Sequence, residues 1–363
     1  MENNIREISN QFRIYGDFID AVPYGSGHIN NTYKVTFDQG GAPVSYIFQK
    51  INTKIFKNPF TLMSNISRVI NHQKNKMDNI NSSTRRALTL IHTNDGCNTY
   101  DDKFNNFWRV YIFIDHAKTY DIMEENSLAF NAAKAYGEFQ QTLVDLPGER
   151  LNETIPDFHN TPKRYDTFER AIKEDIGDRL KDVKEEVAFI LSRKSLASKI
   201  IDFYKKGLIP ERICHYDTKV NNVMMDDKNG EGICVIDLDT VMPGFVAFDF
   251  GDLVRTATSP VAEDEADVSK VTMRIDTFEA LAKGYLAEAG DFLTQTEKDN
   301  LAFGALLITL ENAVRFLTDY LQLDTYYKIH REGHNLDRAR TQIALVKSME
   351  EQFEKMNEVI SQI

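Results

Sequence analysis

Alternating hydrophobic and polar positions dominate the first third of the chain and predict strands. Residues 32–37 alternate, and the turn signal Asp38-Gln39-Gly40-Gly41 leads into a second strand at 44–51. Strand patterns return at 87–92 and 107–114. Apolar residues also recur at helical spacing in two places (Ile5, Ile8 and Phe12; Leu62, Ile66, Val69 and Ile70). This part is therefore expected to be a small sheet with one or two helices.

Helical spacing predominates after residue 115. One apolar face contains Leu128, Ala132, Ala135, Tyr136, Phe139 and Leu143, with Ser127 as the expected N-cap. Further helices are expected at 166–180, 182–206, 264–289, 294–323 and 336–363, and short strands at 213–215, 223–225 and 233–236. A β-rich part followed by a helical part indicates an α+β fold with two lobes, residues 1–115 and residues 116–363.

Composition narrows the possible functions. The 363 residues suffice for two hydrophobic cores, and 42% hydrophobic and 27% charged residues are ordinary for a soluble globular protein. A net charge of −12 argues against nucleic acid or an acidic membrane surface as a partner. The first seven residues lack the apolar core of a signal peptide, and the apolar run at 303–310 is too short to span a bilayer. We therefore expect a cytoplasmic protein.

The cysteines give no disulfide or zinc framework. Cys97, Cys214 and Cys234 are odd in number and widely spaced, which is typical of a reducing compartment. Cys214 and Cys234 lie beside predicted strands, so we expect them to be small core residues.

The most informative motif is His215-Tyr216-Asp217-Thr218-Lys219-Val220-Asn221-Asn222, followed by Asp237 after the β-branched run 235–236. An Asp, an Asn five positions later and an Asp at the end of a strand are typical of kinases. In that chemistry Asp217 would orient a substrate hydroxyl and take its proton, while Asn222 and Asp237 would hold Mg²⁺ on the ATP phosphates. The structural alternative is a His-Asp turn beside a surface hairpin.

A glycine-rich loop lies far upstream, at a turn between strands. In Gly25-Ser26-Gly27 the two glycines carry no side chain, so the backbone N–H groups can approach phosphate oxygens. A flexible hairpin would have the same composition, so this loop gains weight only from the Asp217 motif.

The usual kinase ion pair is missing from the sequence. Kinases place a Lys on the third strand and pair it with a helix Glu, but here Gln49 stands at the expected position and Lys50 one residue later. No Asp or Glu occurs between Asp38 and Asp78. Either Gln49 binds phosphate as a neutral donor or Lys50 reaches in, and the sequence leaves both open.

Several acidic residues follow the catalytic motif. Asp249-Phe250-Gly251 resembles the metal motif of protein kinases, but it stands too far beyond Asp217 and lacks a preceding strand. We expect Asp249, Asp252 and Arg255 to brace the loops behind the site. Asp239 is expected on the same strand face as Asp237, where it would assist the metal.

Aromatic and cationic residues gather late in the chain, around Arg315 and Tyr326. Arg and Tyr can hydrogen-bond sugar hydroxyls while an aromatic face stacks on the ring. Composition alone favours a polar seam between two helices.

These motifs together resemble the aminoglycoside phosphotransferase-like kinases, which share a bilobal protein-kinase-like fold. Within that superfamily the chain most closely resembles the N-acetylhexosamine 1-kinases. The likeness extends from about Tyr24 to about Glu350 in separate blocks, namely 25–30, 153–159, 215–222, 235–244, 248–255 and 315–342.

The resemblance implies ATP- and Mg²⁺-dependent phosphorylation of the anomeric hydroxyl of N-acetylglucosamine or N-acetylgalactosamine. It implies that His28, Arg315 and Tyr326 contact the sugar. Adenine would lie against the backbone near Phe113 and Asp115.

Two departures from the family affect the substrate. The residue after Arg255 is Thr256, where the 1-kinases have an aromatic residue over the acetamido group. The 1-kinases also bring an aromatic residue from the last helix, but the only Trp of this chain is Trp108, in the β-rich part. A different hexose therefore stays open as a substrate. The rival functions are a kinase of another small alcohol, such as an aminoglycoside, choline or homoserine, and a non-catalytic nucleotide-binding protein.

Overall fold

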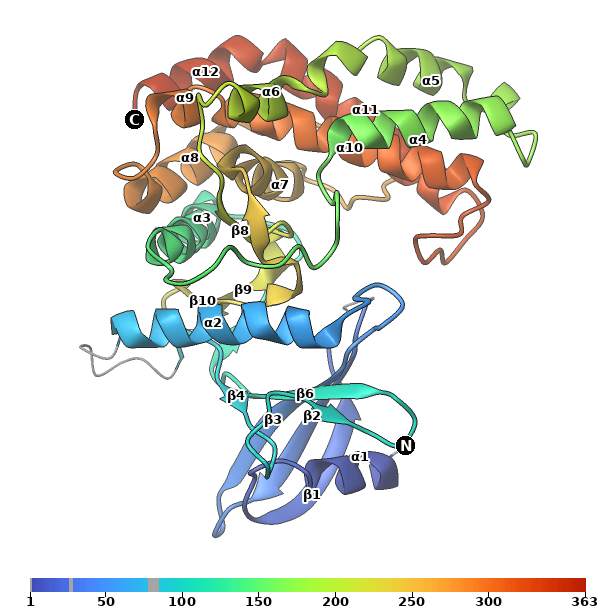
Figure 1. The fold of residues 1–363 in the computed structure, drawn as a ribbon. Helices are drawn as coiled ribbons and strands as arrows, with labels where there is room; N and C mark the ends of the chain where they lie inside the picture. Colours follow the sequence, from blue (N-terminus) through green and yellow to red (C-terminus); the bar gives the residue numbers. More distant parts are fainter. Residues whose placement is uncertain (1, 26–28, 78–84) are drawn as a thin grey trace.

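The computed structural model describes residues 2–25, 29–77 and 85–363. A small lobe built on an antiparallel sheet lies beside a larger, mostly helical lobe, and helix α2 (Pro59–Met77) runs between them (Figure 1). The expected α+β, bilobal architecture is confirmed. The residue pair 115/116, expected as the lobe boundary, falls between strands β6 (Phe107–Ile112) and β7 (Ala117–Lys118).

The small lobe contains a six-stranded sheet in the order β1-β2-β3-β6-β4, with β5 paired to β6. The remaining strands are β1 (Asp17–Pro23), β2 (Asn31–Asp38), β3 (Pro43–Lys50), β4 (Leu90–Ile91) and β5 (Tyr100–Asp101). The predicted strands at 32–37, 44–51 and 107–114 are confirmed, whereas the one at 87–92 shrinks to the two residues of β4. Strand β1 was not expected, because as an edge strand it buries little and shows no apolar alternation.

Helix α1 (Glu2–Ser9) covers one face of this sheet. Ile5 and Ile8 are buried, and Phe12, just beyond the helix, packs edge-on against Phe48 at 5.8 Å between ring centroids. The helical spacing of the N-terminal apolar residues is thus confirmed.

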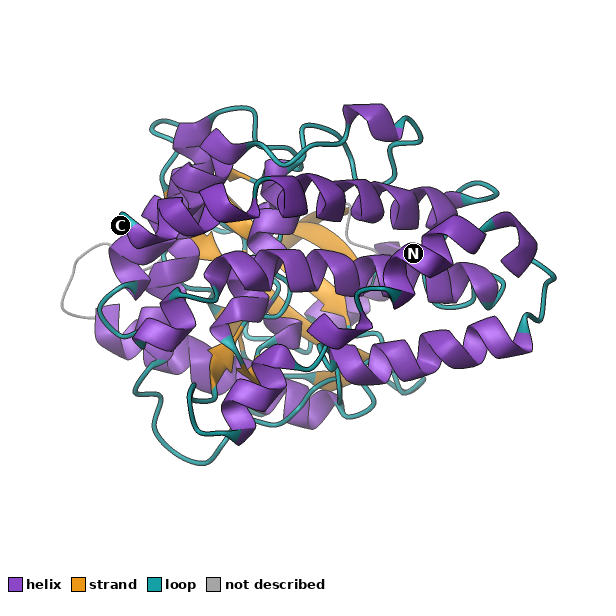
Figure 2. Ribbon diagram, turned by 90° about the horizontal axis from the view of Figure 1, so that it is seen from above, coloured by secondary structure: helices purple, strands orange, loops and turns teal. Residues whose placement is uncertain are grey.

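The larger lobe is built mainly from helices, which cover it when it is seen from above (Figure 2). Its α-helices are α3 (Asn126–Leu143), α4 (Thr161–Glu174), α5 (Lys184–Leu191), α6 (Lys199–Lys205), α7 (Val246–Thr258), α8 (Ile275–Ala289), α9 (Gln295–Lys298), α10 (Leu301–Leu321), α11 (His334–Glu351) and α12 (Phe353–Ser361).

Some helix limits differ from the prediction. The stretch 182–206 is split by a 3₁₀ turn at Lys194–Leu196, and 264–274 is not α-helical, because α8 begins at Ile275. Ser127 is not the N-cap of α3. Glu125 holds that position, without a side-chain cap hydrogen bond.

The apolar run at 303–310 belongs to α10. Among the described residues, this is the one helix that by length and composition could cross a membrane, but 94% of its apolar window is buried inside the protein. A buried core helix of a soluble protein passes the same test. Cys214 and Cys234 are also buried, as expected.

Three short strands of the larger lobe form a sheet in the order β10-β9-β7, and β8 pairs with β11. Their bounds are β8 (Arg212–Cys214), β9 (Val223–Asp226), β10 (Gly232–Val235) and β11 (Met242–Gly244). Residues 215–222 therefore connect β8 to β9, and residues 236–241 connect β10 to β11. The first segment leads into β9, which pairs with β10, and the second leads into β11, which pairs with β8.

Candidate active site

Asp249 of α7 anchors the segment that contains Asp217. Its carboxylate, only 2% exposed, accepts hydrogen bonds from the backbone N–H of His215 (2.7 Å) and Tyr216 (2.8 Å). The Gln140 side chain donates to the same carboxylate at 2.7 Å. The prediction that Asp249 braces the loop behind the site is confirmed.

The loop presents Asp217 and Asn222 together. The Asn222 side-chain N–H group donates to the Asp217 carbonyl at 2.9 Å and to its carboxylate at 3.1 Å. Because the amide nitrogen faces Asp217, the Asn222 amide oxygen is left for another partner. Amide and carboxylate oxygens are the ligands that Mg²⁺ prefers.

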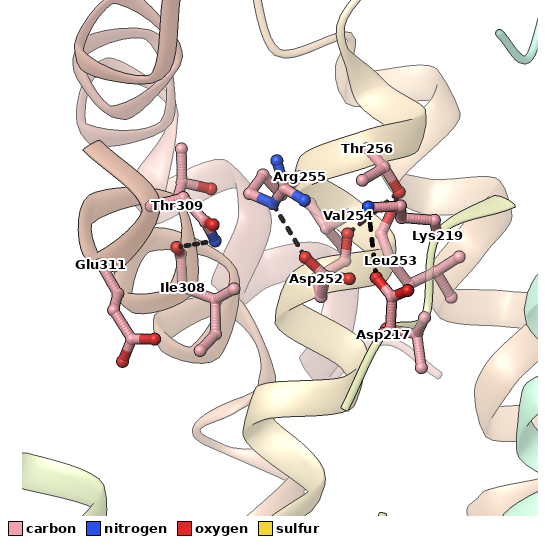
Figure 3. Close-up of polar contacts among 12 residues, drawn as sticks. Asp217, Lys219, Asp252, Leu253, Val254, Arg255, Thr256, Ile308, Thr309 and Glu311 are labelled. Atoms are coloured by element: carbon pink, nitrogen blue, oxygen red, sulfur yellow. Dashed lines mark hydrogen bonds and ion pairs between the residues drawn. The ribbon is translucent and has the colours of Figure 1, made fainter. Parts of the chain in front are cut away.

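Positive charge surrounds Asp217. Burial opposes ionisation of this carboxyl, but Lys219, His215 and Arg255 outweigh it and hold its pKa below the usual value. The Lys219 ammonium lies 3.4 Å from the Asp217 carboxylate (Figure 3). Asp217 is therefore a charged hydrogen-bond acceptor at neutral pH.

Asp237 follows β10 in a left-handed backbone conformation, with φ of 58°. The preceding residue, Ile236, ties this turn to the catalytic loop, since its N–H donates to the Asn222 carbonyl at 2.9 Å and its carbonyl lies 2.8 Å from His215 Nε2. Burial, together with the charges of Asp239 and Asp217, raises the pKa of Asp237 to about 7. A buried carboxylate among other carboxylates needs a cation to neutralise it.

This donor set fits Mg²⁺. Within the described part of the chain, no three His, Cys, Asp or Glu side chains are grouped as a metal cage. Mg²⁺ bound to a nucleotide usually takes only one or two protein oxygens besides phosphates and water. Asp237 and Asn222 would supply these oxygens.

Asp239 does not assist the metal as expected. The left-handed turn at Asp237 takes the chain out of the strand into a 3₁₀ turn, Leu238–Thr240, so strand alternation no longer applies. One carboxylate oxygen of Asp239 is paired with Arg109, and the other accepts from the Asn30 side chain at 2.6 Å.

On the small-lobe side, Gly25 has a φ of 79°, and a side chain there would meet nothing within 4 Å. Ser26, Gly27 and His28 lie outside the described residues, so their predicted contacts stay predictions. Gln49 donates to Thr32 Oγ1 at 3.1 Å and accepts from Arg109 Nε at 2.9 Å.

Lys50 follows Gln49 along β3. Side chains alternate along a strand, so Lys50 lies on the sheet face of the buried Phe48, opposite Gln49. This placement favours Gln49 as the phosphate contact over Lys50.

The segment expected to hold adenine is partly engaged by the protein itself. The Phe113 N–H donates to the Ser45 carbonyl at 3.1 Å, and the carbonyls of Asp115 and His116 accept from Arg85 at 2.8 and 2.9 Å. The Phe113 ring remains half-buried. The adenine contacts of Phe113 and Asp115 stay predictions.

On the other side of Asp217, Arg315 and Tyr326 belong to one cluster. The Arg315 guanidinium lies 5.1 Å from the ring centre of Phe158 and 5.7 Å from that of Tyr327. Tyr326 meets Tyr327 edge-on at 4.8 Å and is 62% exposed. Arg315 makes no ion pair or hydrogen bond among the described residues.

Glu311, one helical turn before Arg315, is occupied by other groups. Its oxygens contact His159 Nδ1 at 2.7 Å and Thr161 Oγ1 at 2.6 Å. The His159 ring stacks on Tyr216, the residue before Asp217, with centroids 5.1 Å apart and planes 11° from parallel. The helix that carries Glu311 and Arg315 is thereby joined, through His159, to the loop that contains Asp217.

Arg164 of α4 was missed in the sequence. It donates to the Phe158 carbonyl at 2.6 Å, but its buried Nε has no hydrogen-bond partner among the described residues. Burial and the charge of Arg315 lower its pKa. The two guanidinium groups thus lie close enough to repel each other, and neither forms an ion pair among the described residues, although Glu311 attracts both.

Arg255 acts electrostatically on both Asp217 and Arg315. It donates to Asp252 at 2.8 Å (Figure 3). It also pairs with Glu263. Asp252 keeps one buried oxygen without a partner among the described residues. Thr256 turns its hydroxyl back onto the Asp252 carbonyl at 3.0 Å. Asp252 and Arg255 pair with each other within α7, and Arg255 also reaches Glu263, so their expected bracing of the loops behind the site stays a prediction.

A family model described as "Phosphotransferase enzyme family" matches residues 20–290. The chain belongs to this phosphotransferase family.

Solved structures similar to this phosphotransferase share its fold at low identity. A spectinomycin phosphotransferase in complex with ADP and spectinomycin is 14% identical, with a TM-score of 0.57, covering 100% of this chain and 99% of its own. An aminoglycoside phosphotransferase from Alicyclobacillus acidocaldarius is 10% identical, with a TM-score of 0.60 and coverage of 94% and 93%. A choline kinase from Cryptosporidium parvum is 14% identical, with a TM-score of 0.59 and coverage of 99% and 98%.

The geometry of this phosphotransferase suits in-line transfer to an alcohol. Asp217 can accept a hydroxyl proton, Lys219 can offset charge beside it, and Asp237 with Asn222 can place a metal nearby. The function is therefore that of a small-molecule phosphotransferase.

Proposed function

We propose that the chain transfers the γ-phosphate of ATP to the anomeric hydroxyl of an N-acetylhexosamine and yields a sugar 1-phosphate. Asp217 would accept a hydrogen bond from the 1-hydroxyl and take its proton as the bond to phosphorus forms. Asn222 and Asp237 would hold Mg²⁺, which supplies charge neutralisation on the phosphates when bound. Gly25, Ser26, Gly27 and Gln49 would face those phosphates.

The charge of the side chains around Arg315 is the main argument for the choice of acceptor. Arg315 and Arg164 leave guanidinium donors without carboxylate partners among the described residues. Nearby carboxylates are already bonded, Glu311 to His159 and Thr161, and Asp319 to the backbone N–H groups of residues 326 and 327. An ammonium substrate such as choline or an aminoglycoside would face repulsion here, because like charges in a half-buried site are costly.

A sugar matches the same groups. Hydroxyl and acetamido oxygens accept from guanidinium donors, and the exposed ring of Tyr326 and the ring of Phe158 offer flat surfaces for a pyranose. His28 is proposed to contact the sugar as well. Thr256 is small and bonded to its own helix, so the acetamido group would have room but little aromatic cover.

One observation favours a cationic acceptor as the second candidate. The unpartnered buried oxygen of Asp252 could accept from an ammonium group. However, the charge of Asp252 is already paired with Arg255 at 2.8 Å. Asp252 therefore fits a sugar hydroxyl better than an ammonium ion.

The proposal is tested by ADP release with ATP and Mg²⁺ over matched acceptors. N-acetylglucosamine and glucosamine differ at one nitrogen, which is neutral in the first and cationic in much of the second, so their kcat/KM ratio reports the charge preference of the pocket. Choline, homoserine and an aminoglycoside complete the panel, and the Asp217→Asn variant controls for contaminating kinases. We expect the acetylated sugar to be preferred. Preference for glucosamine, choline or the aminoglycoside would overturn the acceptor assignment. ATP binding without turnover of any acceptor would favour a non-catalytic role.

A further inference from the structure

A buried arginine stands in the small lobe where the sequence lacks the kinase ion pair. Arg109 lies on β6, next to β3 in the sheet, and is 1% exposed. Its guanidinium pairs with Asp239, which comes from the larger lobe two residues after Asp237. A charge this deeply buried is tolerated only with a partner and further hydrogen bonds.

Arg109 belongs to a network that joins four segments of the chain. Its Nε donates to Gln49 Oε1 on β3 at 2.9 Å. The second oxygen of Asp239 accepts from Asn30, at the end of the glycine-rich loop, at 2.6 Å. The Asn30 side-chain oxygen in turn accepts from the Asn52 N–H at 3.0 Å. Asn30, strands β3 and β6, and the turn that begins at Asp237 are thus connected through Arg109 and Asp239.

The network fixes the orientation of the Gln49 amide. Because Arg109 donates to Gln49 Oε1, the carbonyl oxygen must face Arg109 and the NH₂ group must face away from it. One N–H of that group donates to Thr32 Oγ1 at 3.1 Å. The other has no acceptor among the described residues. It is therefore a donor held ready on the strand where kinases place their phosphate-binding Lys.

Direct contact between Arg109 and a nucleotide is disfavoured by its burial. The guanidinium is already bonded to Asp239 and Gln49, and it also contacts Met63 Sδ at 3.9 Å. Asp239 is held on both oxygens, which also fixes the turn that begins at Asp237. Any effect of Arg109 on the phosphates must therefore pass through Gln49 and the Asp237 turn.

We propose that Arg109 is the positioning residue for the nucleotide phosphates. It aims the Gln49 amide at them and, through Asp239, holds the metal ligand Asp237. The pair Arg109–Asp239 replaces the usual Lys–Glu pair, with the acid supplied by the larger lobe. This inference rests on the proposed function only for ATP as the phosphate donor and not for the sugar.

The test compares ATP with adenosine, which lacks the phosphates, by calorimetric binding to the full chain without an acceptor or Mg²⁺. Losing one hydrogen bond to a charged group corresponds to roughly a tenfold to hundredfold loss of affinity. We expect Gln49→Ala and Arg109→Met each to weaken ATP binding roughly tenfold or more and to leave adenosine binding unchanged. The double variant should bind ATP no more weakly than the weaker single variant, because both changes remove one contact.

Additive losses in the double variant, or equal losses for ATP and adenosine, would overturn the proposal in favour of a merely structural Arg109. Melting temperatures check that each variant is folded. If Arg109→Met does not fold, Arg109→Lys, which keeps a cation for Asp239 but lacks the Nε–H donor to Gln49, takes its place with the same expected ATP-specific loss. ATP binding by the unaltered chain combined with failure on the sugar panel would remove the acceptor assignment alone.

Discussion

The Asp249→Asn variant tests whether a buried carboxylate behind the site holds the catalytic loop. Asp249 accepts three hydrogen bonds of 2.7, 2.7 and 2.8 Å from Gln140 and from the backbone of His215 and Tyr216. An Asn keeps one oxygen for two of these donors and turns its NH₂ group toward the Tyr216 N–H.

The magnitude follows from these contacts. The lost hydrogen bond to a charged acceptor corresponds to about 1.5–3 kcal/mol, and the buried donor left without a partner costs about 1–3 kcal/mol. Removing the buried charge offsets part of this loss in the free energy of unfolding, because burial disfavours the charged carboxylate and raises the pKa of Asp249. We expect a net loss of about 2–4 kcal/mol in the free energy of unfolding. Displacement of Asp217 by even about 1 Å would lower kcat roughly 100-fold.

Urea unfolding and steady-state kinetics measure the two effects. The matched control is Asp166→Asn, the same change at an exposed position of α4 that has no hydrogen bond among the described residues. An unfolding free energy and a kcat that both match the control would refute the bracing role of Asp249.

The remaining predictions concern the catalytic residue, the acceptor pocket and the packing. Asp217→Asn should lower kcat by roughly 10²- to 10⁴-fold with ATP binding intact, and near-normal turnover would remove its role as base. Arg315→Ala should raise the acceptor KM roughly tenfold or more with the ATP KM unchanged, and an unchanged acceptor KM would place Arg315 outside the site. Gly284→Ala should cost about 1–3 kcal/mol of stability, since its Cβ would lie 2.1 Å from the Phe130 carbonyl oxygen; an unaltered melting temperature would contradict this helix contact.

The arrangement of residues 215–222 could be predicted because the spacing that produces it is local in the sequence. The spacing of Asp217 and Asn222 sets their contact within one short turn. The bracing by Asp249 was also expected, since a carboxylate that far beyond the loop lacked a strand to place it at a metal. Most of the candidate site could thus be predicted from local motifs.

Interactions between distant segments were not predictable in the same way. Arg109 and Asp239 are 130 residues apart, and nothing in either local pattern indicates the pair. Asp239 was misplaced because the left-handed φ of Asp237 breaks strand alternation at that residue. Arg164 looked like an ordinary polar position of a surface helix.

Helix α7 was not predicted, for a different reason. Apolar residues recur there at helical spacing (Phe250, Leu253, Val254 and Ala257), but the likeness of Asp249-Phe250-Gly251 to a kinase metal motif favoured a loop over a helix. Strand β1 was missed because it is exposed along most of its length. An exposed edge strand lacks the apolar–polar contrast on which pattern analysis depends, whereas the helical pattern of α7 is present in the sequence.

The central claim is tested most directly by phosphorus NMR of the product formed from ATP and N-acetylglucosamine. Without proton decoupling, phosphate on C1 appears as a signal split by the single anomeric proton. That splitting, lost with the Asp217→Asn variant because no product forms, is the result we predict. A product signal coupled instead to the two protons of C6, or no phosphorylated sugar at all, would contradict the assignment of this chain as an anomeric kinase.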